Sequence, residues 1–323
     1  MAEKNPLFQS RLLHTWVVFK QTHDLMVKLR NQELRRYGLN LEYAATLSLV
    51  PILRKKATPG EIARWRYRRP HTISKLLKYM EADGLIERTS DSQRRNVIHV
   101  TFTDKGRKAH QRAKGTIKSI KRMFSALSED ELECFLRYLE VLRAKAEEHF
   151  ASMYEVKPIH EQFIDGETEY NTWRVLRTVN DVLDRLIEHK LSKEGFSSNM
   201  VWVLRVISML GKDASPGSTA TWRLRSPNTI SDFLIRMERK GLVARKTDPE
   251  KRSHLMVKLT PKGQRYLRQA TMIKPLKHVL ETLTYQELDD FRRLLMKLRV
   301  RVIQELAPKE RTKLLSLPLD LAI

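Results

Sequence analysis

Apolar residues recur at steps of three and four over two long stretches of the chain, about residues 16–30 and 173–187. This spacing places them on one face of a helix, so each stretch predicts a long amphipathic helix. Each apolar seam holds one polar residue near its middle, His23 in the first and Asn180 in the second. These two side chains either set the register of packed helices or, as is more usual, lie partly exposed or bond locally.

A second pair of amphipathic helices is expected where "LSEDELECFLRYLEVLR" from Leu127 matches "LTYQELDDFRRLLMKLR" from Leu283. Their apolar positions again follow steps of three and four. Each long helix is apolar on one side only, so these end helices are expected to pack the two halves of the chain together.

Both pairs of helices belong to a larger repeat. Sliding the sequence by 157 positions aligns residues 15–113 with 172–270 without a gap, and 34 of these 99 positions are identical. A period this long excludes a solenoid of short repeats and indicates a duplicated domain. The predicted organisation is a first domain (1–153), a junction (154–170), a second domain (171–306) and a C-terminal tail (307–323).

Between the long helices, each copy predicts two short helices joined by a tight turn. The stretch "TPGE" from Thr58 is a helix start, with a Thr cap, Pro at the first helical position and Glu61 placed to close a capping box. Ser215 repeats this start, with Ser218 in place of the Glu. Pro70 opens the next helix, because proline is tolerated in a first turn. This is the helix-turn-helix plan.

The second short helix of each copy has an apolar face, which indicates a core contact, and a polar face. The polar positions are those from which a recognition helix meets DNA base edges. The candidate DNA-contacting residues are Arg68, Arg69, His71, Thr72, Lys75 and Lys78 in the first copy and Arg225, Ser226, Asn228, Thr229, Asp232 and Arg236 in the second.

A β-hairpin is expected after each of these helices. Strand-like segments flank the polar tips "SDSQRRN" and "DPEKRS". A hairpin in this place is a wing, and a basic tip suits the negative potential of the minor groove. The tip candidates are Arg94, Arg95, Lys251 and Arg252, although solvation alone explains any single tip charge as well.

The predicted elements combine into one fold class. We expect a mainly α protein with small β-wings, in which two winged helix-turn-helix domains are joined by long N- and C-terminal helices. These long helices are expected to form a pseudo-two-fold bundle of the kind that dimerises separate chains.

The charge of the chain indicates a polyanionic partner. The formal net charge is +23, and the windows 54–112 and 211–269 carry +10 and +9 of it. Nucleic acid is the commonest partner for such a field, although an acidic membrane surface would serve almost as well. Because the charge is concentrated in the helix-turn-helix windows, double-stranded DNA is the favoured partner.

Other features of the sequence exclude several classes of protein. No apolar run approaches the ~18 residues of a membrane span, and the N-terminus lacks the features of a secretory signal. A cytoplasmic, nucleoid-associated protein is therefore expected. Cys134 is the single cysteine, which excludes an internal disulfide and a zinc site built from several thiolates. We expect no metal, no cofactor and no enzymatic activity, since no catalytic motif is recognisable.

The order of elements and the stretch "TISKLLKYMEADGLIERTSDSQRRNVIHVTFTDKG", with its second version, resemble the MarR family of winged-helix transcription regulators. Members are usually homodimers, so the resemblance implies that this chain is a monomer acting as a single-chain pseudo-dimer. Its two lobes would then reach half-sites ~34–36 Å apart. The resemblance also implies that Asp91 and Asp248 brace the wing arginines.

Many members of this family bind small aromatic acids between the winged helix and the end helices, which implies a small aromatic effector here. The tryptophans available to line such a cleft are Trp16, Trp65, Trp173 and Trp222. Tryptophans at helical spacing are more often part of the core.

The functional interpretation is a DNA-binding transcription regulator that represses by covering a promoter. Lys75 of the first copy aligns with Asp232 of the second, and His71 aligns with Asn228. Because these side chains prefer different bases, the predicted operator is asymmetric or degenerate. Alternatively, the second lobe mainly grips phosphate. The alternative function is a DNA-architectural protein with low sequence specificity.

Overall fold

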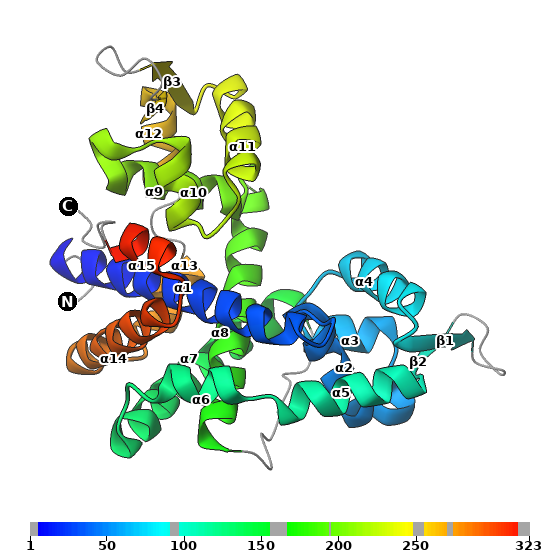
Figure 1. The fold of residues 1–323 in the computed structure, drawn as a ribbon. Helices are drawn as coiled ribbons and strands as arrows, with labels where there is room; N and C mark the ends of the chain where they lie inside the picture. The colour runs from blue at the N-terminus through cyan, green and yellow to red at the C-terminus, as the bar shows by residue number, and fades with distance from the viewer. Residues whose placement is uncertain are drawn as a thin grey trace.

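A computed structural model of the chain describes residues 6–90, 97–155, 167–193, 195–247, 255–269 and 274–315 (Figure 1). The first half contains α1 (Pro6–Arg35), α2 (Leu41–Leu53), η2 (Arg54–Lys56), α3 (Pro59–Trp65), α4 (Pro70–Ala82), β1 (Ile86–Ser90), β2 (Ile98–Phe102), α5 (Asp104–Gly115), α6 (Lys118–Phe124) and α7 (Glu129–Tyr154). The second half contains α8 (Thr168–Lys193), α9 (Ser198–Leu210), η3 (Gly211–Asp213), α10 (Pro216–Trp222), α11 (Pro227–Arg239), β3 (Val243–Thr247), β4 (Leu255–Leu259), α12 (Pro261–Gln269), α13 (Lys274–Leu280), α14 (Tyr285–Gln304) and α15 (Pro308–Leu315).

The elements α1 to α7 recur in the same order as α8 to α14, and the fold is mainly helical with two winged helix-turn-helix units, as predicted. We call residues 41–115, from α2 to α5, lobe 1. Residues 198–269, from α9 to α12, are lobe 2. The helices α1, α6, α7, α8, α13 and α14 form the bundle, from which the two lobes project in different directions (Figure 1).

The bundle pairs helices across the two halves. α1 packs along α14, and α7 packs along α8. The ring of Phe291 in α14 lies 6.3 Å from that of Phe19 in α1 and 5.3 Å from that of Phe135 in α7. Burying side chains of this kind contributes roughly 1.5–3 kcal/mol each, so the two halves share one apolar core.

The polar residues in the apolar seams of α1 and α8, His23 and Asn180, are both buried. His23 Nδ1 lies 3.1 Å from Asp24 Oδ1, its neighbour in the chain. Asn180 accepts a hydrogen bond from Lys20 Nζ at 2.7 Å, and the same ammonium pairs with Asp184 at 2.6 Å. His23 therefore bonds locally, whereas Asn180 bonds across from α8 to α1.

The predicted helix starts are present, but the capping box forms in the second copy and not in the first. Thr58 Oγ1 accepts from the backbone N–H of Glu61 at 3.2 Å. The expected capping box at Glu61 is wrong, because its carboxylate binds Arg64 at 2.9 Å. The reciprocal box forms instead in the second copy, where the Ser218 hydroxyl accepts from the backbone N–H of Ser215 at 2.9 Å.

The turn between the two short helices uses a left-handed residue in both lobes. Tyr67 has a φ of 48° and Leu224 a φ of 52°, a region that costs a residue with a side chain about 1–2 kcal/mol. In lobe 1 the Tyr67 hydroxyl donates to Glu147 of α7 at 2.7 Å, and its ring packs edge-on against Phe150. These contacts with α7 offset the strain of the turn.

The Thr-x-x-Gly motif after each wing holds the next helix against the base of the wing. Thr103 Oγ1 accepts from the N–H of Gly106 at 2.9 Å and donates to the carbonyl of Gly84 at 2.7 Å. A Cβ on Gly106 would lie 1.8 Å from the carbonyl oxygen of Leu85, and Gly263 of lobe 2 is equally crowded. Only glycine allows this backbone approach.

Helix α15 has no counterpart among the described residues of the first half. It packs on α14 and on α10 of lobe 2. Its Leu314 is buried, and its Glu310 pairs with Lys28 of α1 at 2.6 Å. In the part of the chain that the structure describes, no helix is long and apolar enough to cross a membrane.

Candidate nucleic-acid interface

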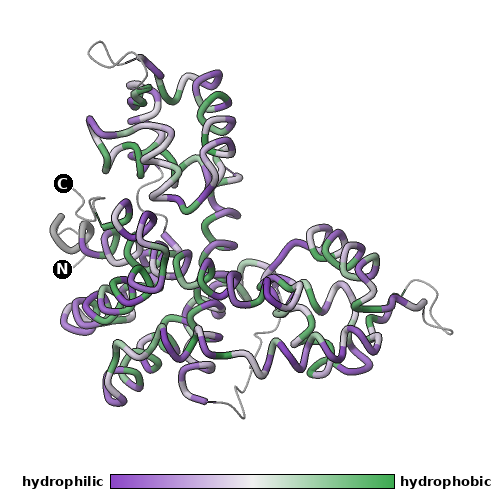
Figure 2. The backbone as a smooth tube through the Cα atoms, viewed as in Figure 1, coloured by the Kyte–Doolittle hydropathy of each residue, from purple (hydrophilic) through white to green (hydrophobic). Residues whose placement is uncertain are grey.

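The helices α4 and α11 each have a buried face and an exposed face. Ile73, Leu77 and Met80 of α4 are buried, as are Ile230 and Leu234 of α11. Hydrophilic and hydrophobic residues therefore alternate along both helices (Figure 2). Both helices border the same open side of the molecule, away from α6 and α14 (Figure 1).

The residues predicted to contact DNA lie on these exposed faces, with one exception. The exposed residues are Arg69, His71, Thr72, Lys75 and Lys78 in lobe 1 and Arg225, Ser226, Asn228, Thr229, Asp232 and Arg236 in lobe 2. The exception is Arg68, which is half-buried.

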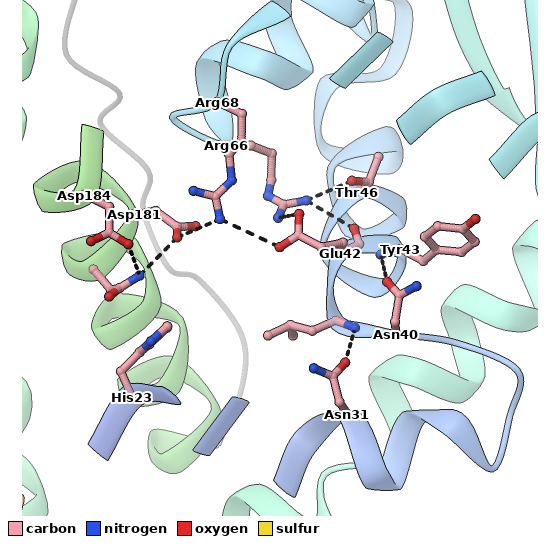
Figure 3. Close-up of polar contacts among 12 residues, drawn as sticks. His23, Asn31, Asn40, Glu42, Tyr43, Thr46, Arg66, Arg68, Asp181 and Asp184 are labelled. Carbon is pink, nitrogen blue, oxygen red and sulfur yellow. Dashed lines mark hydrogen bonds and ion pairs between the residues drawn. The ribbon is translucent and has the colours of Figure 1, made fainter. Parts of the chain in front are cut away.

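Arg68 lies in a cluster of ion pairs between lobe 1 and α8 (Figure 3). Its Nη2 donates to Asp181 Oδ1 at 3.0 Å and lies 3.7 Å from Glu42 Oε1. Arg66 binds the same Glu42 at 2.9 Å. We call Glu42, Arg66, Arg68, Arg177 and Asp181 the lobe 1 cluster.

The lobe 1 cluster is charged at neutral pH. Burial acts to raise the pKa of Glu42 and of Asp181, but the neighbouring arginines lower both pKa values below the ordinary range. The carboxylate of Asp181 raises the pKa of Arg68. Burial lowers the pKa of Arg177, whose guanidinium makes no hydrogen bond to another described residue. The cluster therefore joins lobe 1 to the bundle through full charges.

Lobe 2 has a weaker form of this arrangement. Arg223 Nη1 lies 3.7 Å from Asp24 of α1, so this pair also joins a lobe to the long helix of the other half. Asn199 takes the place of Glu42 and lies 3.4 Å from Arg223. Arg225, which aligns with Arg68, is exposed. The two lobes thus contact the bundle with different charge patterns.

Some features of α4 and α11 were not predicted. Tyr79 of α4 is 54% exposed, and Lys75 Nζ lies 5.8 Å from the centre of its ring. An aromatic residue four positions after a lysine on a polar face is the sequence signal for this pair. In lobe 2 Ser226 caps α11 by accepting from the N–H of Thr229 at 3.2 Å. Ser226 therefore stabilises the helix as well as lying on its exposed face.

An ion pair attaches the base of each wing to the helix before it, α4 in lobe 1 and α11 in lobe 2. Arg88 of β1 donates to Glu81 of α4 at 2.9 Å, and Arg245 of β3 donates to Glu238 of α11 at 2.8 Å. The predicted wing residues Asp91, Arg94, Arg95, Asp248, Lys251 and Arg252 lie outside the described residues.

A cleft between lobe 1 and α8 is lined by aromatic and cationic side chains. We call it the lobe 1 cleft, and the side chains that characterise it are Arg30, Trp65, Arg66, His110, Tyr170, Trp173, Arg174 and Arg177. No acidic residue is among the described residues that line it. An arrangement of this kind attracts an anion with an aromatic body.

The corresponding space in lobe 2 is filled. The ring of Trp202 lies 6.4 Å from that of Trp16 and 6.2 Å from that of Trp222. The guanidinium of Arg223 lies 5.7 Å from the centre of the Trp202 ring. Of the four tryptophans considered for an effector cleft, Trp16, Trp173 and Trp222 are buried core residues, and Trp65 is half-buried. Trp65 and Trp173 also line the lobe 1 cleft.

The described residues contain no group of His, Cys, Asp or Glu side chains placed to hold a metal ion. Cys134 is half-buried, and its sulfur lies 3.3 Å from Arg137 and 3.8 Å from Asp290. The contact with Asp290 joins α7 to α14 inside the bundle, far along the chain from α4 and α11.

The sequence of the chain matches no known protein-family model and no curated protein sequence. Among solved structures it is similar to the ligand-free organohalide-sensing RdhR transcriptional regulator, with 22% identity, a TM-score of 0.41, and coverage of 46% of this chain and 88% of that one. It is also similar to an S. aureus MepR mutant bound to an oligodeoxyribonucleotide, with 26% identity and a TM-score of 0.28. That match covers 33% of this chain and 80% of MepR.

Proposed function

We propose that the chain is a DNA-binding transcription regulator whose two lobes contact one DNA duplex. The observation that carries the proposal is that α4 and α11 each have an exposed polar face and both border the same open side of the molecule (Figure 1). The basic charge concentrated in the two lobes supports it, because phosphate contacts dominate affinity for DNA. A monomer would supply the arrangement that usually needs two copies.

In this proposal the recognition helices enter neighbouring major grooves and the wings reach the minor grooves. Lobe 1 presents Lys75 and Lys78, which suit guanine or phosphate. Lobe 2 presents Asn228, which suits adenine, and Asp232, which suits cytosine. The two half-sites therefore differ, and the protein represses by covering a promoter. The wing contacts of this proposal are Arg94, Arg95, Lys251 and Arg252, braced by Asp91 and Asp248.

Arg68 has an orienting role in the proposal. Its guanidinium is bound to Asp181 and lies beside Glu42, just before the first turn of α4. A side chain held in this way fixes the direction of the recognition helix relative to α8.

Selection of bound fragments from random duplex DNA, followed by sequencing, tests the proposed function. We expect two unlike half-sites with centres ~34–36 Å apart. Lys75→Ala should relax only one half-site and Asn228→Ala only the other, each by about 1–3 kcal/mol of discrimination. Absence of DNA binding at about 50 mM salt contradicts the proposal. Tight binding without sequence enrichment favours the DNA-architectural alternative.

The small aromatic effector expected from the resemblance has a candidate site in the lobe 1 cleft. We propose that an aromatic carboxylate bound there lowers the affinity for DNA, because Arg66 and Arg177 line the cleft and belong to the same cluster as the Arg68–Asp181 pair that joins lobe 1 to α8. Anisotropy of labelled operator DNA with and without benzoate measures the effect. An unchanged affinity contradicts the effector.

A further inference from the structure

The bundle contains two equivalent contacts at the places where the chain returns from a lobe. α6 follows lobe 1 and packs against α14, and α13 follows lobe 2 and packs against α7. Residues 118–124 align with residues 274–280, so the duplication relates these two contacts. We call the contact of α6 with α14 the lobe 1 joint and that of α13 with α7 the lobe 2 joint. Because each short helix follows its lobe closely in the chain, each joint limits how far that lobe can shift.

The lobe 1 joint is closed by opposite charges. Arg122 Nη1 of α6 lies 3.3 Å from Glu305 Oε2, just after the end of α14. The same carboxylate binds Arg301 at 2.9 Å, and Arg301 Nε donates to the backbone carbonyl of Arg122 at 3.1 Å. One carboxylate is thus shared by two guanidinium groups. Carboxylate and guanidinium groups keep these charges across the physiological pH range, so this joint stays closed there.

The lobe 2 joint has imidazole rings at the same two positions. His278 aligns with Arg122, and His149 aligns with Glu305. The two rings stack, with centroids 5.6 Å apart and 28° between their planes. His278 is exposed, whereas His149 is half-buried and its Nε2 has no hydrogen-bond partner among the described residues. Contact between two rings therefore closes this joint in place of an ion pair.

The surroundings of His149 disfavour its protonated form. The charged groups that act on it are Lys145 and Glu148 of α7 and His278 of α13, and the described residues of α8 and α14 add none. The Glu148 carboxylate binds Lys145 at 2.9 Å, and its effect on His149 is smaller than those of burial, Lys145 and His278. Burial, with the help of the two cationic neighbours, lowers the pKa of His149. Its ring is therefore uncharged at neutral pH.

Protonation turns the contact between the two rings from attraction into repulsion. Stacked neutral rings attract each other, whereas two like charges at this distance repel. In the lobe 1 joint a carboxylate lies between two cations, but in the lobe 2 joint protonated His149 would itself be a cation beside Lys145 and His278. The closed lobe 2 joint is fully stabilised above about pH 6.5, the ordinary value for histidine, and loses this stabilisation as pH falls through the lowered pKa of His149.

We propose that His149 and His278 form an acid-sensitive switch, which frees α13 from α7 in mild acid and leaves the lobe 1 joint closed. The switch is separate from the contacts that attach the lobes to α8 and α1. Its consequence for DNA rests on the proposed function. With α13 free, lobe 2 is no longer held at a fixed distance from lobe 1, so α4 and α11 lose the spacing that a two-part operator requires.

Hydrogen exchange of the full chain without DNA, at about pH 7.5 and about pH 5.5, tests the switch on both sides of the ordinary histidine value. EDTA in the buffer prevents a metal ion from bridging the two imidazoles. The amides of α6 in the same sample correct for the intrinsic effect of pH on exchange. We expect the protection of α13 relative to α6 to fall about threefold or more in acid. An unchanged ratio overturns the proposal.

Exchanging residues between the joints locates the switch. The double variant His149→Glu with His278→Arg copies the lobe 1 joint into the lobe 2 joint, and it should keep α13 protected at both pH values. His189→Gln is the matched control, because it removes another half-buried imidazole of the bundle whose pKa burial lowers. This control should keep the acid response of α13. A response that survives in the double variant, or disappears in the control, overturns the assignment to His149 and His278.

The switch and the proposed function fail separately, because hydrogen exchange needs no DNA. Anisotropy of labelled operator DNA at the same two pH values measures the link between them. The wild type should lose about threefold or more in affinity in acid relative to the double variant, a comparison in which protonation elsewhere, including His71, cancels. Equal pH dependence of the two proteins overturns the link. Absence of DNA binding by both at neutral pH contradicts the proposed function, while exchange still decides the switch.

Discussion

Lobe 1 is held against α8 mainly by ion pairs, whereas lobe 2 is held against α1 mainly by a cluster of three indoles. In lobe 1 the contact is centred on Arg68 and Asp181, 3.0 Å apart. In lobe 2 it is centred on Trp202, between Trp16 and Trp222. Ion pairs respond to pH and salt, and apolar contacts respond much less. The two lobes share one fold, but different interactions attach them to the equivalent helices α8 and α1. The attachment of lobe 1 to α8 should therefore be more sensitive to pH and salt than that of lobe 2 to α1.

The comparison shows what fusion of the two halves permits. In a homodimer each substitution appears at both ends of the molecule. In a single chain, Ala45 and Trp202 occupy aligned positions and differ. One lobe can therefore be packed tightly while the other keeps a cleft.

The largest predicted effect is the loss of the indole cluster around Trp202. Trp202→Ala should lower the free energy of unfolding by about 3–5 kcal/mol, because it leaves a cavity in a buried aromatic cluster. Urea denaturation measures the effect, and hydrogen exchange should place it in α9 and α10. Trp65→Ala is the matched control, and its effect should be clearly smaller because Trp65 is half-buried. Equal losses for the two variants would show that the lobes are packed alike.

The next effect concerns the lobe 1 cluster. Asp181→Asn should lower the free energy of unfolding by about 2–3 kcal/mol, less than for a fully buried pair, because Arg68 keeps 27% of its side chain exposed. Hydrogen exchange should rise in α3 and α4 but not in α10 and α11. Faster exchange in lobe 2 as well would contradict separate attachment.

The same cluster predicts a response to acid. The folded pKa values of Glu42 and Asp181 are lowered, so their stabilisation is present above about pH 4 and is lost as pH falls through the lowered values. Between pH 6 and pH 3 the stability of Asp181→Asn should therefore fall less steeply than that of the wild type. Denaturation at each pH measures both stabilities. If the two proteins lose stability in parallel, the lobe 1 cluster does not cause the response to acid.

The next effect should be equal in the two lobes, because the glycine that packs against the base of the wing has the same surroundings in both. Gly106→Ala and Gly263→Ala each place a Cβ within 2 Å of a carbonyl oxygen, which forces the backbone to shift. We expect each to lower the free energy of unfolding by about 1–3 kcal/mol, as for other overpacked sites. Thermal melts of the two variants should coincide. A clear difference between them would mean that the wing bases are not equivalent.

The smallest predicted effect is a difference in stability between variants at the starts of α4 and α11. Ser226 caps α11 through its side chain, whereas Arg69 at the same position makes no side-chain cap. Ser226→Ala should therefore cost about 1 kcal/mol, and Arg69→Ala should leave stability unchanged. Circular dichroism during thermal unfolding measures both. An effect of Arg69→Ala on stability would assign that side chain a structural contact.

The sequence predicted the elements of the fold well, because each depends on local signals. Thr58 and Ser215 cap the helices that they were expected to cap, and the apolar spacing located the long helices. The exposed residues of α4 and α11 followed from the same periodicity. These signals act within a few residues along the chain, which is why a single sequence reveals them.

The attachment of the lobes could not be predicted in the same way. Arg68 was expected on the exposed face, but its partner Asp181 is 113 positions away, and no local pattern connects them. Trp202 reads as one more apolar residue of an amphipathic helix, and only the packing of α9 against α1 shows that it fills a cleft. Such contacts depend on how elements meet, and helical periodicity carries no information about that.

The pairing of α1 with α14 has a consequence for the synthesis of the protein. Arg35 ends α1 and Tyr285 begins α14, so 250 positions separate the two helices. At about 5–20 residues per second, roughly 12–50 s of translation pass before α14 exists. Throughout that time the apolar stripe of α1 that contains Phe19 lacks the helix that covers it. Helix α1 is thus made long before the helix that covers it, and the nascent chain needs protection from aggregation until α14 has been made.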